Sequence, residues 1–281
     1  MITGATRGIG LAMARAYASQ GASVFIASRS QASVESAINQ LRLAGFRVNG
    51  IAADVSDLDQ VMSLAGATIA EFGTIDIWVN NAGAAGPYGP TVQMDPGTFL
   101  DVIKTDIVGV YYGSIVAMEH FLSQGHGKLI NMLGRGAKEP VPYQNAYASS
   151  KAWVRQFTQT LAQETKNSGV GIYAFSPGMV LTDLLTHGEV IQGSEDRLKN
   201  FPLVLRILAQ PPEAVIDKAV WLASSATDGK TGLEVYTTTP TKMMLSALRV
   251  GIRALIKRPV PPVEIDMKVI PPQTRLKGLK H

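Results

Sequence analysis

The sequence predicts an α/β fold: a single domain built on a doubly wound parallel sheet of about seven strands, with helices on both faces. Short apolar runs alternate along the chain with longer stretches of helical periodicity. Most of these runs are continuously apolar, as strands are when both faces of their sheet are covered. In addition, a glycine-rich turn joins the first apolar run to the first helical stretch.

Strand and helix alternate over residues 1–240, which we take as the catalytic domain. The first strand is short for a central position, so either the chain start is truncated or the sheet tolerates a stub. The fourth helix begins at Asp95-Pro96, an N-cap followed by proline at the first helical position. The predicted strands are 1–3, 22–28, 47–54, 75–80, 128–133, 171–175 and 233–236, and the predicted helices are 8–20, 31–44, 57–72, 96–124, 145–168 and 212–225.

Composition excludes several classes of site. The chain has no cysteine, which excludes disulfides and thiol nucleophiles and suits the cytoplasm or another reducing compartment. The four histidines are scattered without ligand spacing, so we expect no metal site. No apolar run reaches the ~18 residues that a membrane-spanning helix needs.

Positive charge is concentrated in residues 241–281, expected to form a helix and a basic, partly disordered tail. Residues 242–281 hold nine Lys or Arg against two acids, a net charge of +7, which leaves −3 for residues 1–241 of the chain's total of +4. A nucleic-acid partner is therefore not expected, because the predicted domain offers no basic surplus. The helix predicted over 241–257 is amphipathic. Its basic side could contact an anionic membrane surface, or its apolar side could pack on the domain or on another subunit.

A glycine-rich loop, TGATRGIG, runs from Thr3 to Gly10 between the first strand and the first helix. Its glycines allow a tight turn and a close approach of the backbone to a ligand. The helix N-terminus beyond them offers free N–H groups and the positive end of a dipole, which suit a pyrophosphate. We therefore predict the dinucleotide-binding turn of a Rossmann fold, formed by Gly4, Thr6, Arg7, Gly8, Ile9 and Gly10.

The end of the second strand indicates which dinucleotide binds. NAD-binding proteins commonly carry an acid here, whereas this chain has Ser28, Arg29 and Ser30. A guanidinium and two hydroxyls favour a 2′-phosphate, and Arg7 adds a second positive charge. The cofactor predicted is NADP(H).

Five motifs in order resemble the short-chain dehydrogenase/reductase family over roughly residues 1–240. They are TGATRGIG at 3–10, Asp54-Val55, Asn80-Asn81-Ala82-Gly83, Tyr147-Ala148-Ser149-Ser150-Lys151, and Pro177-Gly178 followed by Thr182.

The resemblance implies a role for each motif. Asp54 and Val55 are expected at the adenine, Asn81, Ala82 and Gly83 at the ribose, and Pro177, Gly178, Val180 and Thr182 at the nicotinamide. Tyr147 is expected to give a proton to the carbonyl oxygen as hydride arrives. Lys151, one helical turn on, is expected to bind the ribose hydroxyls and to lower the pKa of Tyr147. The family also implies a homo-oligomer formed through the two long helices.

Two of the family's catalytic positions differ in this sequence. The serine expected thirteen residues before Tyr147 is Gly134, and the asparagine expected in helix 96–124 is Asp106. Three explanations stay open for the glycine. Asn145 or Tyr143 could supply the missing hydrogen bond, the substrate could be an easily reduced aldehyde, or the protein could bind its cofactor without catalysing. In the family, the residue at this position mainly uses its backbone carbonyl to hold a water near the lysine. Asp106 is expected either to keep that role while its carboxylate raises the pKa of Lys151, or to point its side chain elsewhere.

Four segments resemble, more narrowly, the chlorophyll b reductase branch of the family: IDIWVNNAG, NMLGRG, SPGMVLTDLL and ILAQPPEAV. That branch reduces a formyl group on a chlorin ring. Residues 183–211 stand where the family has its substrate lid, and their apolar side chains favour a hydrophobic carbonyl substrate. The function predicted is an NADP(H)-dependent oxidoreductase. The alternative is a catalytically silent NADP(H)-binding subunit.

Overall fold

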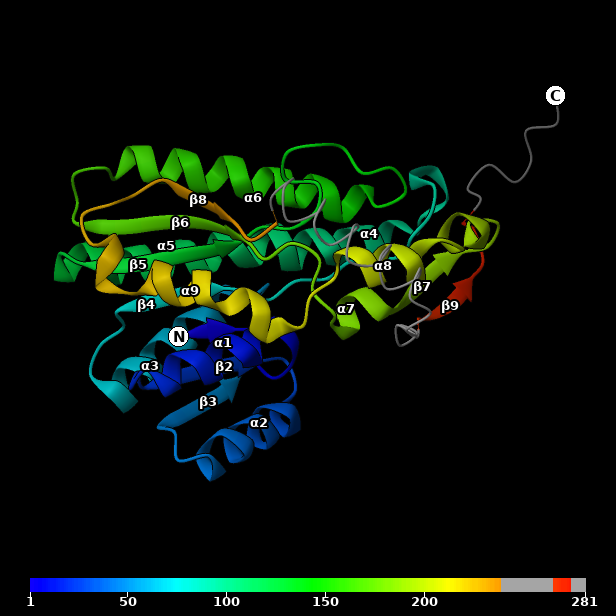
Figure 1. The fold of residues 1–281 in the computed structure, drawn as a ribbon. Helices are drawn as coiled ribbons and strands as arrows, with labels where there is room; N and C mark the ends of the chain where they lie inside the picture. Colours follow the sequence, from blue (N-terminus) through cyan, green and yellow to red (C-terminus); the bar gives the residue numbers. More distant parts are fainter. Residues whose placement is uncertain (239–264, 274–281) are drawn as a thin grey trace, which may run out of the picture.

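The computed structural model describes residues 1–238 and 265–273 (Figure 1). Its main sheet has seven strands, and every neighbouring pair is parallel. The strand order β3-β2-β1-β4-β5-β6-β8 confirms the predicted single Rossmann-type domain. The strands are β1 (Ile2–Thr3), β2 (Val24–Ser28), β3 (Val48–Ala52), β4 (Ile77–Asn80), β5 (Gly127–Met132), β6 (Val170–Ser176) and β8 (Leu233–Tyr236).

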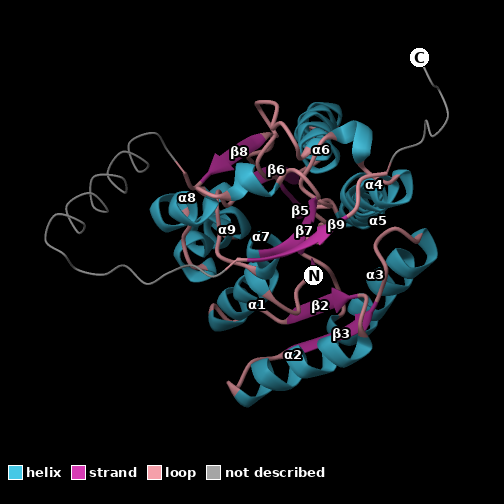
Figure 2. Cartoon of the chain, turned by 90° about the vertical axis from the view of Figure 1, so that its right-hand side faces the viewer, coloured by secondary structure: helices cyan, strands magenta, loops and turns pink. Residues whose placement is uncertain are grey.

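Helices cover both faces of this sheet, as predicted, and Figure 2 shows them on opposite sides of the strands. One buried apolar cluster joins the sheet to α1 (Gly8–Ser19), α2 (Gln31–Leu43) and α9 (Ile216–Ala223). A second joins its other face to α3 (Leu58–Phe72), α5 (Gly109–Gln124) and α6 (Asn145–Glu164). Because helices cover both faces of the sheet, its strands are continuously apolar.

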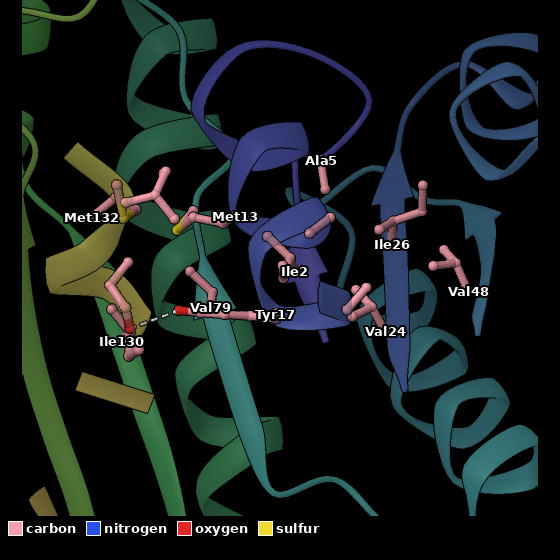
Figure 3. Close-up of a cluster of buried hydrophobic side chains, with 14 of the residues drawn as sticks. Ile2, Ala5, Met13, Tyr17, Val24, Ile26, Val48, Val79, Ile130 and Met132 are labelled. Atoms are coloured by element: carbon pink, nitrogen blue, oxygen red, sulfur yellow. Dashed lines mark hydrogen bonds between the residues drawn. The ribbon is translucent and has the colours of Figure 1, made fainter. Parts of the chain in front are cut away.

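The central strand β1 has only two residues. Ile2 pairs with Ile26 of β2 on one side and Val79 of β4 on the other. Its side chain is 1% exposed and lies in the middle of the first apolar cluster (Figure 3).

The helix predicted over 96–124 forms without a break, but it is not α-helical throughout. The segment consists of α4 (Pro96–Ile103), a π-helical stretch (Lys104–Val108) and α5. A π-helical stretch holds an extra residue per turn and often marks a functional site. Here it contains Asp106, whose side chain is fully buried.

The predicted lid, residues 183–211, folds into four short elements. They are α7 (Asp183–Thr186), β7 (His187–Ile191), a 3-10 turn (Glu195–Leu198) and α8 (Phe201–Leu208). The sequence did not indicate that β7 pairs, in parallel, with β9 (Asp266–Ile270) from the C-terminal tail. This small sheet lies beside the main one, at the right of Figure 1. The helix predicted over 241–257 lies outside the described residues. No helix in the described part is long and apolar enough to span a membrane.

A buried polar network crosses the middle of the domain. The Asn80 amide donates to Asn131 Oδ1 at 2.8 Å and to Ser114 Oγ at 3.1 Å, and Asn131 donates to Thr158 Oγ1 at 3.0 Å. Trp78 Nε1 donates to Asn80 Oδ1 at 2.8 Å. The network therefore links β4, α5, β5 and α6 below the site, with each polar group partnered.

Asn131→Ala should destabilise the fold, because it removes an acceptor of Asn80 and a donor to Thr158 while both remain buried. We expect a fall of about 2 kcal/mol or more in the free energy of unfolding, measured in urea. The matched control is Asn200→Ala at an exposed position, with an expected change within about 0.5 kcal/mol. Equal stability of the two variants would show that the network contributes nothing.

Candidate active site

The predicted cofactor motifs meet where β1, β4 and β6 end. Gly4 has φ +62°, and a Cβ on it would lie 2.8 Å from Ala82 Cα. Gly8 has φ +54°, and its Cβ would lie 3.1 Å from Thr182 Cγ2. The glycine loop thus packs directly on the 81–83 and 178–182 segments. This explains why a left-handed conformation and the absence of a side chain are both needed there.

Asn81 ties β4 to this loop. Its side-chain amide donates to Thr3 O at 2.9 Å and to Gly4 O at 3.0 Å. The Thr3 hydroxyl accepts from the backbone N–H of Asn81 at 3.0 Å and of Ala82 at 3.1 Å. Asn81 therefore positions the glycine turn through its side chain. Thr3 was not predicted as a site residue, because its hydroxyl contacts backbone atoms of β4 and of the segment after it, and no sequence pattern marks such contacts.

The segment after β6 faces the glycine loop from the other side. Gly178 has φ +74°, and Val180 is buried and forms a parallel bridge with Gln210. Arg7, predicted to meet a phosphate, forms an exposed ion pair with Asp183 at 3.1 Å. Beside them opens a cavity of about 390 Å³, lined by Arg7, Gly8, Leu11, Ala12, Arg15, Gln40, Leu181, Thr182, Asp183, Pro212 and Glu213.

Arg29 follows β2 and is exposed. Within the described chain its guanidinium makes no hydrogen bond or ion pair, so it is open to an anionic ligand. The Ser30 hydroxyl caps α2 by accepting from Ser33 N at 3.3 Å. Ser28 is partly buried at the end of β2.

Asp54 follows β3 and does not cap the next helix, since the N-cap of α3 is Asp57. Asp54 Oδ1 accepts from Ser56 N at 2.9 Å and from Ser56 Oγ at 2.8 Å. Its other carboxylate oxygen accepts no hydrogen bond from the described residues. Val55 is buried, and its side chain fills the space that a Cβ on Gly109 would need.

The proposed proton-transfer residues occupy the first two turns of α6. Lys151 is buried, and its Nζ lies 3.0 Å from Asp106 Oδ2. Asp106 Oδ1 accepts from Ala84 N at 2.7 Å, and Ser150 Oγ lies 3.4 Å from Oδ2. The Lys151 Nζ lies 5.3 Å from the centre of the Tyr147 ring. Asp106 therefore does not point elsewhere, because its carboxylate contacts the catalytic lysine directly.

The surroundings of Tyr147 shift its pKa in opposite directions. Burial raises the pKa of Tyr147, Lys151 lowers it as expected, and Asp106 raises it, which leaves it above the ordinary value. Burial lowers the pKa of Lys151, but Asp106 and Tyr147 raise it, and the net shift is upward. The lowering of the Tyr147 pKa by Lys151 is outweighed by burial and by the opposing carboxylate, which the spacing of the two residues does not reveal.

Gly134 lies against the Tyr147 hydroxyl, and a Cβ on Gly134 would overlap that oxygen. The tyrosine thus reaches into the space of a side chain at this position. Asn145 does not act as the missing donor in this structure. It is exposed, its amide donates to Thr91 Oγ1 at 3.2 Å, and it makes no hydrogen bond to Tyr147 within the described chain.

Tyr88 connects the predicted lid to the segment before α6, through its backbone to β7 and through its ring to Tyr143. The Tyr88 N–H donates to Glu189 O of β7 at 2.8 Å, and the Tyr88 carbonyl accepts from Ile191 N at 2.9 Å. Its ring lies 5.6 Å from that of Tyr143, over which Arg197 sits at 4.3 Å. Tyr143 has φ 68°, which is rare for a tyrosine and has no sequence signal.

These residues fit a dinucleotide. Gly4, Gly8 and Gly10 carry no side chain that would keep a phosphate from the backbone of the turn. Gly8, Ile9 and Gly10 precede the first backbone hydrogen bond of α1, from Leu11 N to Arg7 O at 3.2 Å. Arg29 and one carboxylate oxygen of Asp54, both predicted to contact the cofactor, have no hydrogen-bond partner among the described residues. No group of histidine or acidic side chains in the described part could hold a metal ion.

A sequence model of the short chain dehydrogenase family matches residues 1–189. That match, together with the sheet order and the Tyr147–Lys151 site, defines the class: the chain belongs to the short-chain dehydrogenase/reductase family and has the oxidoreductase fold of that family.

Individual relatives of this chain carry the names of several different reductases. A probable chlorophyll(ide) b reductase of Arabidopsis thaliana is 31% identical over 235 residues, which cover 76% of this chain and 46% of the relative. The structure of a variant actinorhodin polyketide ketoreductase with NADPH is 26% identical, with a TM-score of 0.76 over 84% of this chain and 94% of that one. The structure of the Brucella melitensis 3-ketoacyl-(acyl-carrier-protein) reductase with NADH is 27% identical, with a TM-score of 0.75 over the same shares.

Proposed function

We propose that this protein is an NADP(H)-dependent reductase of a hydrophobic carbonyl compound, an aldehyde of the chlorophyll b reductase type in the first instance. The observation that carries the proposal is the position of Tyr147. Its hydroxyl lies at the end of β5, on the same edge of the sheet as the glycine loop and next to a buried lysine. A nicotinamide cofactor is common to the two solved relatives, one with NADPH and one with NADH.

When bound, a reduced nicotinamide supplies the hydride. Tyr147 then acts as the general acid and donates its phenolic proton to the carbonyl oxygen. Lys151 lies beside the resulting phenolate as one member of a buried ion pair with Asp106. The backbone of Gly134 lets the phenol approach the end of β5 closely. Thr182 and the backbone of 178–180 would hold the nicotinamide carboxamide, and Asp54 would accept from the adenine amino group.

The predicted lid offers exposed apolar side chains to a substrate, since Leu184 and Leu203 are 46% and 49% exposed. The formyl group of a chlorin fits the missing serine, since an aldehyde needs less polarisation than a ketone. The ketoreductase relatives make a polyketide-like ketone the next substrate class to test.

The second candidate is a silent NADP(H)-binding subunit. It is favoured by the loss of the serine donor at Gly134, since one oxyanion donor is typically worth about 10²–10³ in rate. It is also favoured by the carboxylate of Asp106, which partly neutralises the lysine.

One preparation separates the two functions. NADPH binding is titrated by its fluorescence, and its oxidation is then followed with matched aldehyde and ketone pairs, including a formyl-chlorin. If the protein is a reductase of the proposed type, NADPH oxidation should be faster with the aldehyde than with the ketone of each pair. Tight NADPH binding without turnover of any carbonyl would favour the silent subunit.

Arg29→Ala should discriminate between the two dinucleotides. Loss of a charged hydrogen bond costs about 1.5–3 kcal/mol, so the Kd for NADPH should rise by about tenfold or more while that for NADH changes little. Lys166→Ala, at an exposed position after α6, controls for net charge. Equal affinity of the unmodified protein for NADPH and NADH would contradict the assignment of Arg29.

Two further proposals concern partners. A homo-oligomer is supported by an aromatic cluster on α5 and α6, where Trp153 stacks on Phe157 at 4.8 Å and Tyr111 is 43% exposed. Sedimentation of the purified protein tests it. A peripheral membrane contact through 241–257 is tested by pelleting with anionic liposomes before and after deletion of 241–281.

A further inference from the structure

The ion pair between Lys151 and Asp106 differs from an ordinary surface pair. Its two side chains are 5% and 0% exposed, and their charged atoms lie 3.0 Å apart. Asp106 is also held from another direction by Ala84 N, which donates to Oδ1 at 2.7 Å, whereas the Ser150 hydroxyl, 3.4 Å from Oδ2, donates to Tyr147 O at 2.7 Å. The carboxylate is therefore held in one position, so the lysine charge cannot turn to another partner without leaving it unpaired.

The electrostatic surroundings of Tyr147 contain both members of this pair. Its own helix α6 contributes Lys151, and the π-helical stretch contributes Asp106. The end of β5 contributes only uncharged groups, namely Gly134 at the hydroxyl and the Met132 carbonyl, which accepts from Lys151 at 3.5 Å. The 81–84 segment contributes Gly83 and the backbone N–H of Ala84. The lysine and the aspartate together leave the tyrosine beside a pair of zero net charge.

We propose that Asp106 is a positioning residue that neutralises Lys151 and thereby holds Tyr147 in its protonated form over neutral and moderately alkaline pH. This inference rests on the proposed reductase function. It makes the site suited to carbonyl reduction across this range, because reduction needs the phenol. Alcohol oxidation needs the phenolate and is confined to higher pH.

The direction of the effect follows from the charges. With Asp106 the phenolate would form beside a neutral pair and in a buried position, so the pKa of Tyr147 lies above its ordinary value. With asparagine at 106 the phenolate would form beside an uncompensated ammonium. The pKa of Tyr147 should then fall, and the alkaline decline of the reduction rate should move to lower pH.

The test is a spectroscopic titration of tyrosinate absorbance in the full chain without nucleotide. The difference between the unmodified protein and Tyr147→Phe isolates the transition of Tyr147, which should lie above the ordinary value of about 10. The same difference measured in the Asp106→Asn background should place the transition about one pH unit lower or more. Ser150→Ala keeps the carboxylate and should leave the transition in place.

A Tyr147 transition at or below the ordinary value in the unmodified protein would overturn the proposal, and this measurement does not require Asp106→Asn to fold. A transition unmoved in folded Asp106→Asn would overturn it as well. Where turnover is found, the alkaline limb of kcat/KM for reduction should shift by the same amount as the absorbance transition. A correct absorbance shift without turnover in the unmodified protein would reject the reductase function while leaving the role of Asp106 towards Tyr147 intact.

Discussion

Tyr147→Phe should lower kcat for carbonyl reduction by about 10²–10⁴, the usual contribution of a positioned general acid. The phenyl ring keeps the packing of α6, and the Lys151–Asp106 ion pair remains in place. NADPH affinity should therefore fall far less than kcat. The measurement is steady-state turnover combined with a fluorescence titration of NADPH on the same preparation.

Tyr173→Phe is the matched control. Its hydroxyl is buried and donates to Thr227 O and Lys230 O at 3.0 Å, near the beginning of β6 and away from the site. This variant should lose about 1 kcal/mol of stability and retain its turnover. Undiminished turnover in Tyr147→Phe would falsify the proton-transfer mechanism.

Gly134→Ala should lower kcat by about a hundredfold, the scale of a misplacement of about 1 Å in a catalytic group. A Cβ at this position overlaps the Tyr147 hydroxyl, so the phenol must move. Gly134→Ser should lower kcat to a similar extent, although it restores the hydroxyl that the family usually has at this position. Turnover is compared at saturating NADPH, and thermal unfolding checks that the fold is retained.

Gly66→Ala controls for the general effect of removing a glycine, since a Cβ there meets nothing within 4 Å on the surface of α3. It should leave turnover unchanged and stabilise the helix by up to about 1 kcal/mol. A rise in turnover in Gly134→Ser would show instead that the site lacks a donor and that the tyrosine accommodates one.

The sequence predicted a doubly wound parallel sheet of about seven strands, and the structure brings its loop motifs together at one edge. Strand ends in a parallel sheet share one edge, so the loops at 3–10, 81–83 and 177–182 had to converge. The π-helical stretch was not predictable, because its apolar spacing is compatible with a continuous α-helix. The orientation of Asp106 depends on that stretch, and the raised pKa of Tyr147 depends in turn on Asp106 and on burial.

Gly134 illustrates a different limit. Its identity was visible in the sequence, but a missing side chain suggested a missing hydrogen bond. The structure shows that the glycine instead makes room for Tyr147, which only the three-dimensional approach of α6 to β5 reveals. The pairing of β7 with β9 joins segments far apart in the chain, and no local pattern marks such a partner.

Because β7 pairs with β9, the C-terminal part of the chain contributes a strand to the predicted lid but none to the main sheet. The seven-stranded sheet that holds the dinucleotide motifs is complete at Tyr236. The outer strand of the predicted lid is instead Asp266–Ile270. Under the proposed function, substitutions in that strand should change substrate preference without disturbing the glycine loop or Tyr147. Homologues with the same main sheet and different C-terminal segments should then differ in substrate preference while keeping the same coenzyme.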